Sequence, residues 1–175
     1  MSRINLAEVK FLLLRYSIIS GDLMDPLQLA YIGPLLALIG GIVGSVIGIL
    51  KAGAAGVATL GEDPGQFRNV IVLAALPMTQ TFYGFIFFFM VLSKLTALTG
   101  VEGLKGILYL GLGAFVGIAE LLSAVYQGRV CATGISLLSR TKGGVFLSTM
   151  ILAVYVELFG ILGMVFGLLG ILLWG

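Results

Sequence analysis

The amino-acid sequence predicts an all-α membrane protein with four transmembrane helices, arranged as two duplicated antiparallel hairpins. Of its 175 residues, 59% are hydrophobic and 10% are charged, and it contains no histidine, a composition that excludes an ordinary soluble domain. The chain also has four long apolar segments, and about 20 apolar residues cross the hydrocarbon core as a helix. These segments lack the alternation of barrel strands, so helices are the remaining solution in lipid.

Residues 1–26 form a predicted N-terminal extension. Arg3, Lys10 and Arg15 surround the apolar run Phe11–Leu14, which is too short to span a bilayer. Such a basic and apolar segment is typical of an amphipathic helix that lies on the membrane surface.

The first predicted hairpin covers residues 27–98. Its two spans contain the uncharged runs 27–50 and 69–93, and the Gly- and Pro-containing stretch 61–65 is the turn between them.

The second predicted hairpin covers residues 104–175 and follows a linker at 99–103. Its first span, 104–138, is interrupted by Glu120 and Arg129, and its second, 143–174, only by Glu157. A turn is predicted at 139–143. Basic residues are equally frequent on the two sides of the predicted spans, so they do not fix the orientation.

The two hairpins look like copies of each other. The stretch Gly44–Gly56 loosely echoes Ser123–Gly134, and Gly84 corresponds to Gly163. Counting six residues back from each of the latter two glycines pairs Met78 with Glu157. A duplicated hairpin in which only the second copy keeps the acid is a specific pattern.

Small residues recur along the first and third spans. They are Gly40, Gly44, Gly48, Ala52 and Gly56 on the first, and Gly113, Gly117, Ala124, Gly128 and Ala132 on the third. Small residues at this spacing let helix backbones approach closely in lipid. The stripe has two interpretations, packing within one four-helix bundle or a crowded inner wall of a homo-oligomeric ring. Its length favours the ring, with spans two and four outside.

Glu157 is the main candidate for function. A carboxylate in the middle of an apolar span is expensive unless it is neutralised, and such residues mark ion pathways. Leu76, Thr79, Gln80 and Tyr83 lie three or four residues apart, hence on one face of the second span. Pro77 removes a backbone N–H and predicts a local kink there. Neutral oxygen donors around one carboxylate suit a small hard cation.

These residues also carry a family resemblance. Leu76–Gly84, Tyr126–Val130 and Glu157 resemble the proteolipid rotor subunit of V-type ATPases, above all its sodium-translocating bacterial branch. The resemblance covers roughly residues 30–175. One departure is Met78, where a thioether would crowd the site without adding a hard ligand.

The resemblance implies a sodium site and a set of partners. It places the sodium ligands on the Leu76 carbonyl, Thr79, Gln80, Gln127 and Glu157, with a supporting hydrogen bond from Tyr83. It implies a homo-oligomeric rotor ring in a bacterial plasma membrane, in contact with lipid, a stator membrane subunit and central-stalk subunits. The chain would not be an enzyme by itself, because ATP is hydrolysed in the soluble head.

Alternatives remain open at this point. Glu157 could carry a proton, in which case Thr79, Gln80 and Gln127 are packing, or the chain could be a stand-alone cation transporter. The net charge of +2 is too small to indicate a nucleic-acid partner. Glu120 has no evident role: it could be protonated or water-bonded inside the ring, pair with Lys94 or Lys105, or form a second ion site.

Overall fold

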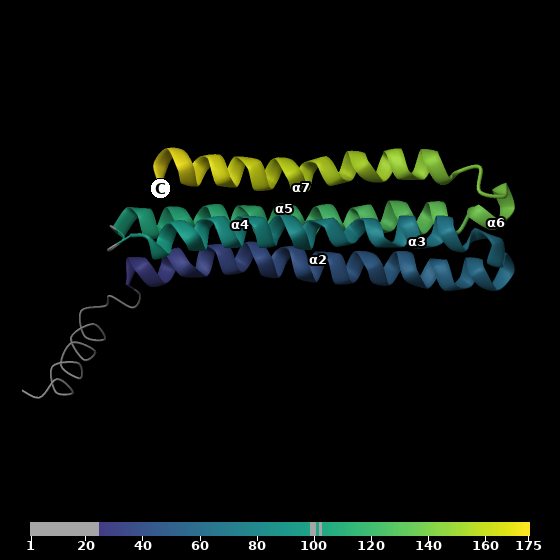
Figure 1. Ribbon diagram of the computed structural model, residues 1–175, viewed down its shortest axis with the longest axis horizontal. Coiled ribbons are helices and arrows are strands. Elements are labelled where there is room, and N and C mark those ends of the chain that lie inside the picture. The colour runs from purple at the N-terminus through teal and green to yellow at the C-terminus, as the bar shows by residue number, and fades with distance from the viewer. Residues whose placement is uncertain (1–24, 99–100, 102) are drawn as a thin grey trace, which may run out of the picture.

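A computed structural model describes residues 25–98, 101 and 103–175 of the chain. These residues form long, roughly parallel helical rods and contain no strand (Figure 1). The predicted surface helix at 1–26 lies almost entirely outside the described residues, as does most of the linker at 99–103. The elements are α2 (Pro26–Glu62), α3 (Phe67–Ala75), α4 (Thr79–Thr96), α5 (Gly103–Ile135), α6 (Leu138–Thr141) and α7 (Phe146–Trp174), with short 3₁₀ turns at Pro64–Gln66 and Leu76–Met78.

Four of the helical rods are long and apolar enough to cross a membrane, as the sequence predicts. Their outward surfaces carry large apolar side chains such as Phe89, Phe159 and Leu173, whereas Gln80 and Gln127 are fully buried. An apolar exterior around a polar interior suits a lipid environment, where buried polar groups must find partners inside the protein.

Side-chain hydrogen bonds and turn residues set the ends of α2. Helix α2 begins where the Asp25 side chain accepts a hydrogen bond from the Leu27 N–H at 3.0 Å, directly before Pro26. It then runs to Glu62 and ends within the predicted turn at 61–65. The chain turns at Asp63, whose side chain accepts from the Gly65 N–H.

The second predicted turn is partly helical. Residues 139–141 belong to α6, and the reversal falls on Lys142 and Gly143, both with positive φ. At φ +83°, Gly143 occupies a conformation that a residue with a Cβ adopts only with strain.

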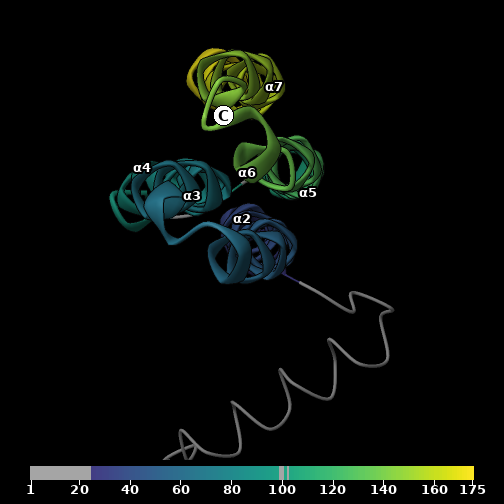
Figure 2. The same cartoon turned by 90° about the vertical axis from the view of Figure 1, so that its right-hand side faces the viewer.

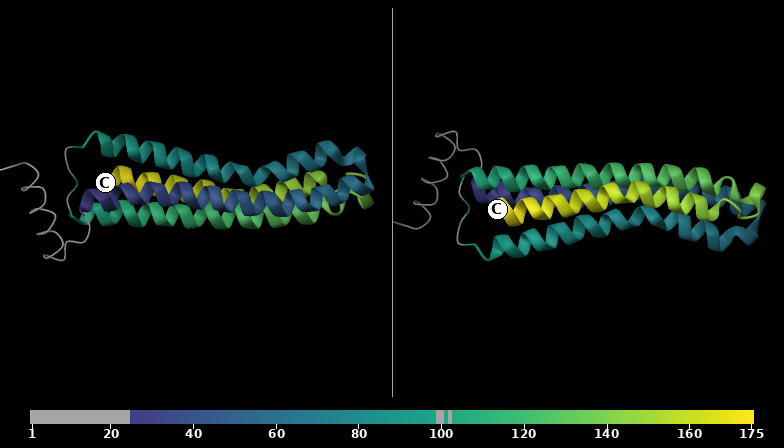
Figure 3. Two further views of the ribbon diagram at one scale, coloured as in Figure 1. Left: turned by 90° about the horizontal axis from the view of Figure 1, so that it is seen from below. Right: turned by 90° about the horizontal axis from the view of Figure 1, so that it is seen from above.

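The kink predicted at Pro77 is present. The helix between α3 and α4 tightens into the 3₁₀ turn Leu76–Met78, and the views in Figure 3 show the rod bending there. Proline lacks the N–H that an α-helix needs at this point, which explains the local change.

The small-residue stripe joins α2 to α5 within one chain. Figure 2 shows α2 and α5 side by side, with α4 next to α2 and α7 next to α5. A Cβ on Gly48 would lie 2.5 Å from the Ala124 carbonyl oxygen, and one on Gly40 would overlap the backbone of Gly117. The simpler interpretation, packing within the bundle, therefore explains these glycines. Gly56 at the end of the stripe faces Val70 of α3 and not α5. That the stripe also forms the inner wall of a ring, as its length suggests, stays a prediction.

Candidate functional site

Glu157 occupies the interior between α4, α5 and α7. Its side chain is 8% exposed. The Tyr83 hydroxyl of α4 donates to Glu157 Oε1 at 2.8 Å, and the Gln127 amide of α5 donates to Glu157 Oε2 at 3.2 Å. Both donors are uncharged, so they orient the carboxylate without neutralising it.

Gln127 connects this carboxylate to Gln80. The Gln80 amide nitrogen donates to Gln127 Oε1 at 3.0 Å, and the Gln127 amide nitrogen also lies 3.3 Å from the Ala153 carbonyl of α7. Both glutamines are fully buried. Buried amides at such depth hold helices together and leave carbonyl oxygens in the interior.

The 3₁₀ turn adds oxygens next to Gln80. The Thr79 hydroxyl lies 3.0 Å from the Leu76 carbonyl oxygen and 3.2 Å from Gln80 Oε1, and shares its proton between them. The Leu76 carbonyl thus accepts from both the Thr79 N–H and the Thr79 hydroxyl, a bond back to the same helix that threonine commonly makes. Carbonyl, hydroxyl and carboxylate oxygens thus gather within three helices.

All six residues predicted from the sequence belong to this one hydrogen-bonded network. Leu76, Thr79, Gln80 and Tyr83 come from the bent helix, Gln127 from α5 and Glu157 from α7. Such a set of oxygens is the chemistry that small hard cations prefer.

Met78 is 45% exposed, unlike the fully buried Gln80 and Gln127. The hydrogen-bonded network forms with methionine at this position, and the crowding that the sequence suggests stays a prediction.

Sequence reasoning missed Ser123. Its hydroxyl accepts a hydrogen bond from Gln80 Nε2 and donates to the Val156 carbonyl of α7, each at 3.0 Å. It lies four residues before Gln127, so the α-helical repeat places it on the same face of α5. The four-residue spacing between Ser123 and Gln127 was the sequence signal that could have identified Ser123.

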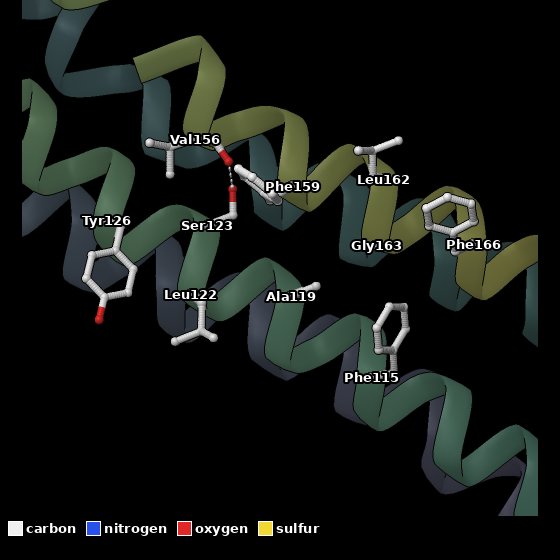
Figure 4. Close-up of a pocket in the computed structure, with 10 residues that line it drawn as sticks. All are labelled: Phe115, Ala119, Leu122, Ser123, Tyr126, Val156, Phe159, Leu162, Gly163 and Phe166. Carbon is white, nitrogen blue, oxygen red and sulfur yellow. Dashed lines mark hydrogen bonds between the residues drawn. The ribbon is translucent and has the colours of Figure 1, made fainter. Parts of the chain in front are cut away.

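Beyond Ser123 the helices α5 and α7 enclose an apolar groove of about 610 Å³. Figure 4 shows its aromatic and aliphatic lining, including Phe115, Phe159 and Phe166, with the Ser123–Val156 hydrogen bond at one end. The groove contributes almost no polar surface, so the polar network has an apolar boundary on this side.

Glu120 lies one turn before Ser123 and is fully buried. Neither of its carboxylate oxygens has a hydrogen-bond partner among the described residues. Of the alternatives left open by the sequence, pairing with a lysine is not what the described residues show, since neither Glu120 oxygen has a partner and the Lys94 ammonium donates to the Ile171 carbonyl at 2.8 Å. The Glu120 carboxylate lies against Gly160 of α7, which leaves room for it.

Comparison with known proteins identifies the family. A family model for the C subunit of ATP synthase matches residues 32–91 and again residues 110–170. The chain belongs to this family. The double match also confirms the duplication of the hairpin that the sequence predicts.

Two relatives place the chain further. It is 33% identical over 136 residues to the V-type sodium ATPase subunit K of Enterococcus hirae, covering 74% of this chain and 81% of that protein. It is 31% identical over 147 residues to the A-type ATP synthase subunit K of Methanocaldococcus jannaschii, covering 84% of this chain and 63% of that protein. The chain is therefore a multi-pass membrane rotor subunit of the V- and A-type ATPase family.

Proposed function

We propose that this chain forms the homo-oligomeric rotor ring of a V-type ATPase in a bacterial plasma membrane and carries sodium ions through it. The ion is held by the Leu76 carbonyl, Thr79, Gln80, Gln127 and Glu157, while Tyr83 orients the carboxylate. Each hairpin, 27–98 and 104–175, acts as one structural unit. The observation that carries the proposal is the buried hydrogen-bonded network that connects Glu157, through Gln127, to the oxygen-bearing groups of Gln80, Thr79 and Leu76.

The number of neutral donors favours sodium over a proton. A proton needs a single carboxylate oxygen, so a proton carrier has no use for buried amides and a hydroxyl drawn from separate helices. The four neutral groups that the network connects to Glu157 carry the oxygen atoms that a cation requires when it loses its water shell. The sodium-specific name of the Enterococcus relative points the same way.

Charge neutralisation is the centre of the mechanism. With sodium bound, Glu157 carries no net charge in its site, and the rotor turns past lipid at little cost. Where the ring meets the stator, water and a stator cation weaken the hold on the ion. ATP hydrolysis in the soluble head turns the central stalk and the ring. The chain itself supplies binding and release, not catalysis.

Carbodiimide labelling tests the identity of the ion. Carbodiimides attack protonated carboxyls, so sodium on Glu157 excludes the reactive form. We expect sodium or lithium to slow the labelling of Glu157 in purified rings, and potassium to slow it far less because the site suits a small cation. Labelling of the exposed Glu62 serves as the internal control and should ignore all three ions.

The opposite result has a clear meaning. Labelling of Glu157 that depends on pH and ignores sodium would show a proton-carrying rotor, and Thr79, Gln80 and Gln127 would then serve only in packing.

A further inference from the structure

Glu120 is a second buried carboxyl that the proposed sodium site does not use. It is fully buried, and both of its oxygens lack a hydrogen-bond partner within residues 25–98, 101 and 103–175. Most buried polar groups in proteins have a partner. A carboxyl with none requires an explanation of its own.

The residues around Glu120 leave space for its side chain. Gly160 faces it from α7, and a Cβ at that position would lie 2.8 Å from Glu120 Oε2 and 3.1 Å from Ser123 Oγ. Gly160 follows Glu157 by three residues and therefore lies on the adjacent turn of α7. The two carboxyls thus occupy neighbouring levels of the same interior, and Ser123 lies near Gly160 as Glu120 does.

Aligning the two repeats shows that they differ at the position of Glu120. The offset that pairs Met78 with Glu157 also pairs Gly41 with Glu120 and Thr81 with Gly160. In the first half the Thr81 hydroxyl donates to the Gly41 carbonyl at 3.3 Å. The equivalent positions therefore face each other in both halves. In the second half the glycine of the pair, Gly160, lies on α7, and the acid, Glu120, lies on α5.

Two positive charges are needed to neutralise the buried carboxylates of Glu120 and Glu157. An isolated ionised carboxylate in an apolar interior is too costly to persist, so it must bind a cation or a proton. In the described part of the chain, no lysine or arginine donates to Glu120 or to Glu157. One sodium ion on Glu157 neutralises only one of the two acids.

We propose that each copy of the chain binds two monovalent cations, one on Glu157 and a second on Glu120, where the second is a sodium ion or a proton. The inference rests on the proposed function for the ion on Glu157. The Glu120 site draws on its own carboxylate and, for sodium, on the neighbouring Ser123 hydroxyl.

The test counts cations in purified rings. Bound sodium per subunit is measured for the wild type, Glu120→Gln and Glu157→Gln, and infrared spectroscopy detects protonated carboxyls in the same samples. Glutamine keeps the volume of glutamate and removes the charge, and a detergent gel confirms that the rings are assembled. If a variant ring does not assemble, the wild-type ring still tests the inference, because isotope-labelled glutamate identifies protonated glutamates as a class and the count of bound sodium plus protonated glutamates must reach two per subunit.

Two results support the inference. Either the wild-type ring binds two sodium ions per subunit and each variant loses one, or it binds one sodium ion and shows a protonated carboxyl that disappears in Glu120→Gln. Two protonated carboxyls with no sodium would refute sodium at Glu157 and still support two cations per subunit.

The inference is overturned if the wild-type ring holds one sodium ion and no protonated carboxyl. It is also overturned if Glu120→Gln carries as many cations as the wild type. In both cases Glu120 would be ionised and balanced by a positive charge from outside the described residues.

Discussion

Replacing Gln127 by alanine separates ion binding from packing most directly. Gln127 links α4, α5 and α7, accepting from Gln80 at 3.0 Å and donating to Glu157 at 3.2 Å. After truncation, Gln80 Nε2 keeps its bond to Ser123 and Glu157 keeps its bond from Tyr83. Each of these two polar groups therefore keeps a hydrogen-bond partner, and the helices should stay assembled.

The expected loss of affinity follows from one missing oxygen next to an ion. A hydrogen bond or equivalent contact to a charged group contributes about 1.5–3 kcal/mol, which corresponds to roughly a ten- to hundredfold change in a dissociation constant. We expect Gln127→Ala to weaken sodium binding in this range. The assay is the sodium concentration that half-protects Glu157 from carbodiimide in purified rings.

Gln66 provides a matched control. It is also a buried glutamine, but it bonds to Asp63 and Asn69 at the turn after α2. Gln66→Ala should leave the half-protecting sodium concentration unchanged. An assembled Gln127→Ala ring with wild-type sodium affinity would refute the ligand role of Gln127 and leave it a packing residue.

Two further substitutions test other parts of the structure. Tyr83→Phe removes the 2.8 Å hydrogen bond to Glu157. Because a hydrogen bond to a charged group contributes about 1.5 kcal/mol, the substitution should weaken sodium binding by roughly tenfold. Equal sodium affinities of Tyr83→Phe and wild type would show that Tyr83 does not hold the carboxylate. Gly48→Leu should destabilise the subunit and thereby the ring, because a Cβ there already lies 2.5 Å from the Ala124 oxygen and 2.6 Å from Pro77 Cβ. A Cβ at Gly53 meets nothing within 4 Å, so Gly53→Leu should keep the wild-type melting temperature of the subunit. The two melting temperatures in detergent decide this, and a normal value for Gly48→Leu would contradict the close packing of α2 and α5.

Much of the fold was accessible from the sequence because lipid imposes simple rules. Long apolar runs in a membrane become helices, since no water satisfies the backbone. Proline marks the bend at Leu76–Met78, and the offset between Gly84 and Gly163 reveals the duplicated hairpin. Glycine and proline at 61–65 mark the end of α2 at Glu62, whereas the predicted turn at 139–143 was less accurate, because α6 extends to Thr141.

The network was also largely predictable, residue by residue. The helical repeat places Leu76, Thr79, Gln80 and Tyr83 on one face, and a lone acid in an apolar span indicates an ion site. Ser123 went unrecognised because a serine in a membrane helix most often bonds to its own backbone, and only its position opposite Val156 shows that it bonds across helices.

The sequence by itself determined the membrane fold, the repeat and the types of residue around Glu157, because these follow from composition and from spacing along single helices. The tertiary structure decided the contacts between helices. The glycine stripe joins α2 to α5 within the chain, Met78 is partly exposed, and Glu120 lies buried against Gly160 without a partner among the described residues. Helical periodicity fixes which residues share a face, but the rotation of each helix about its axis depends on packing with its neighbours.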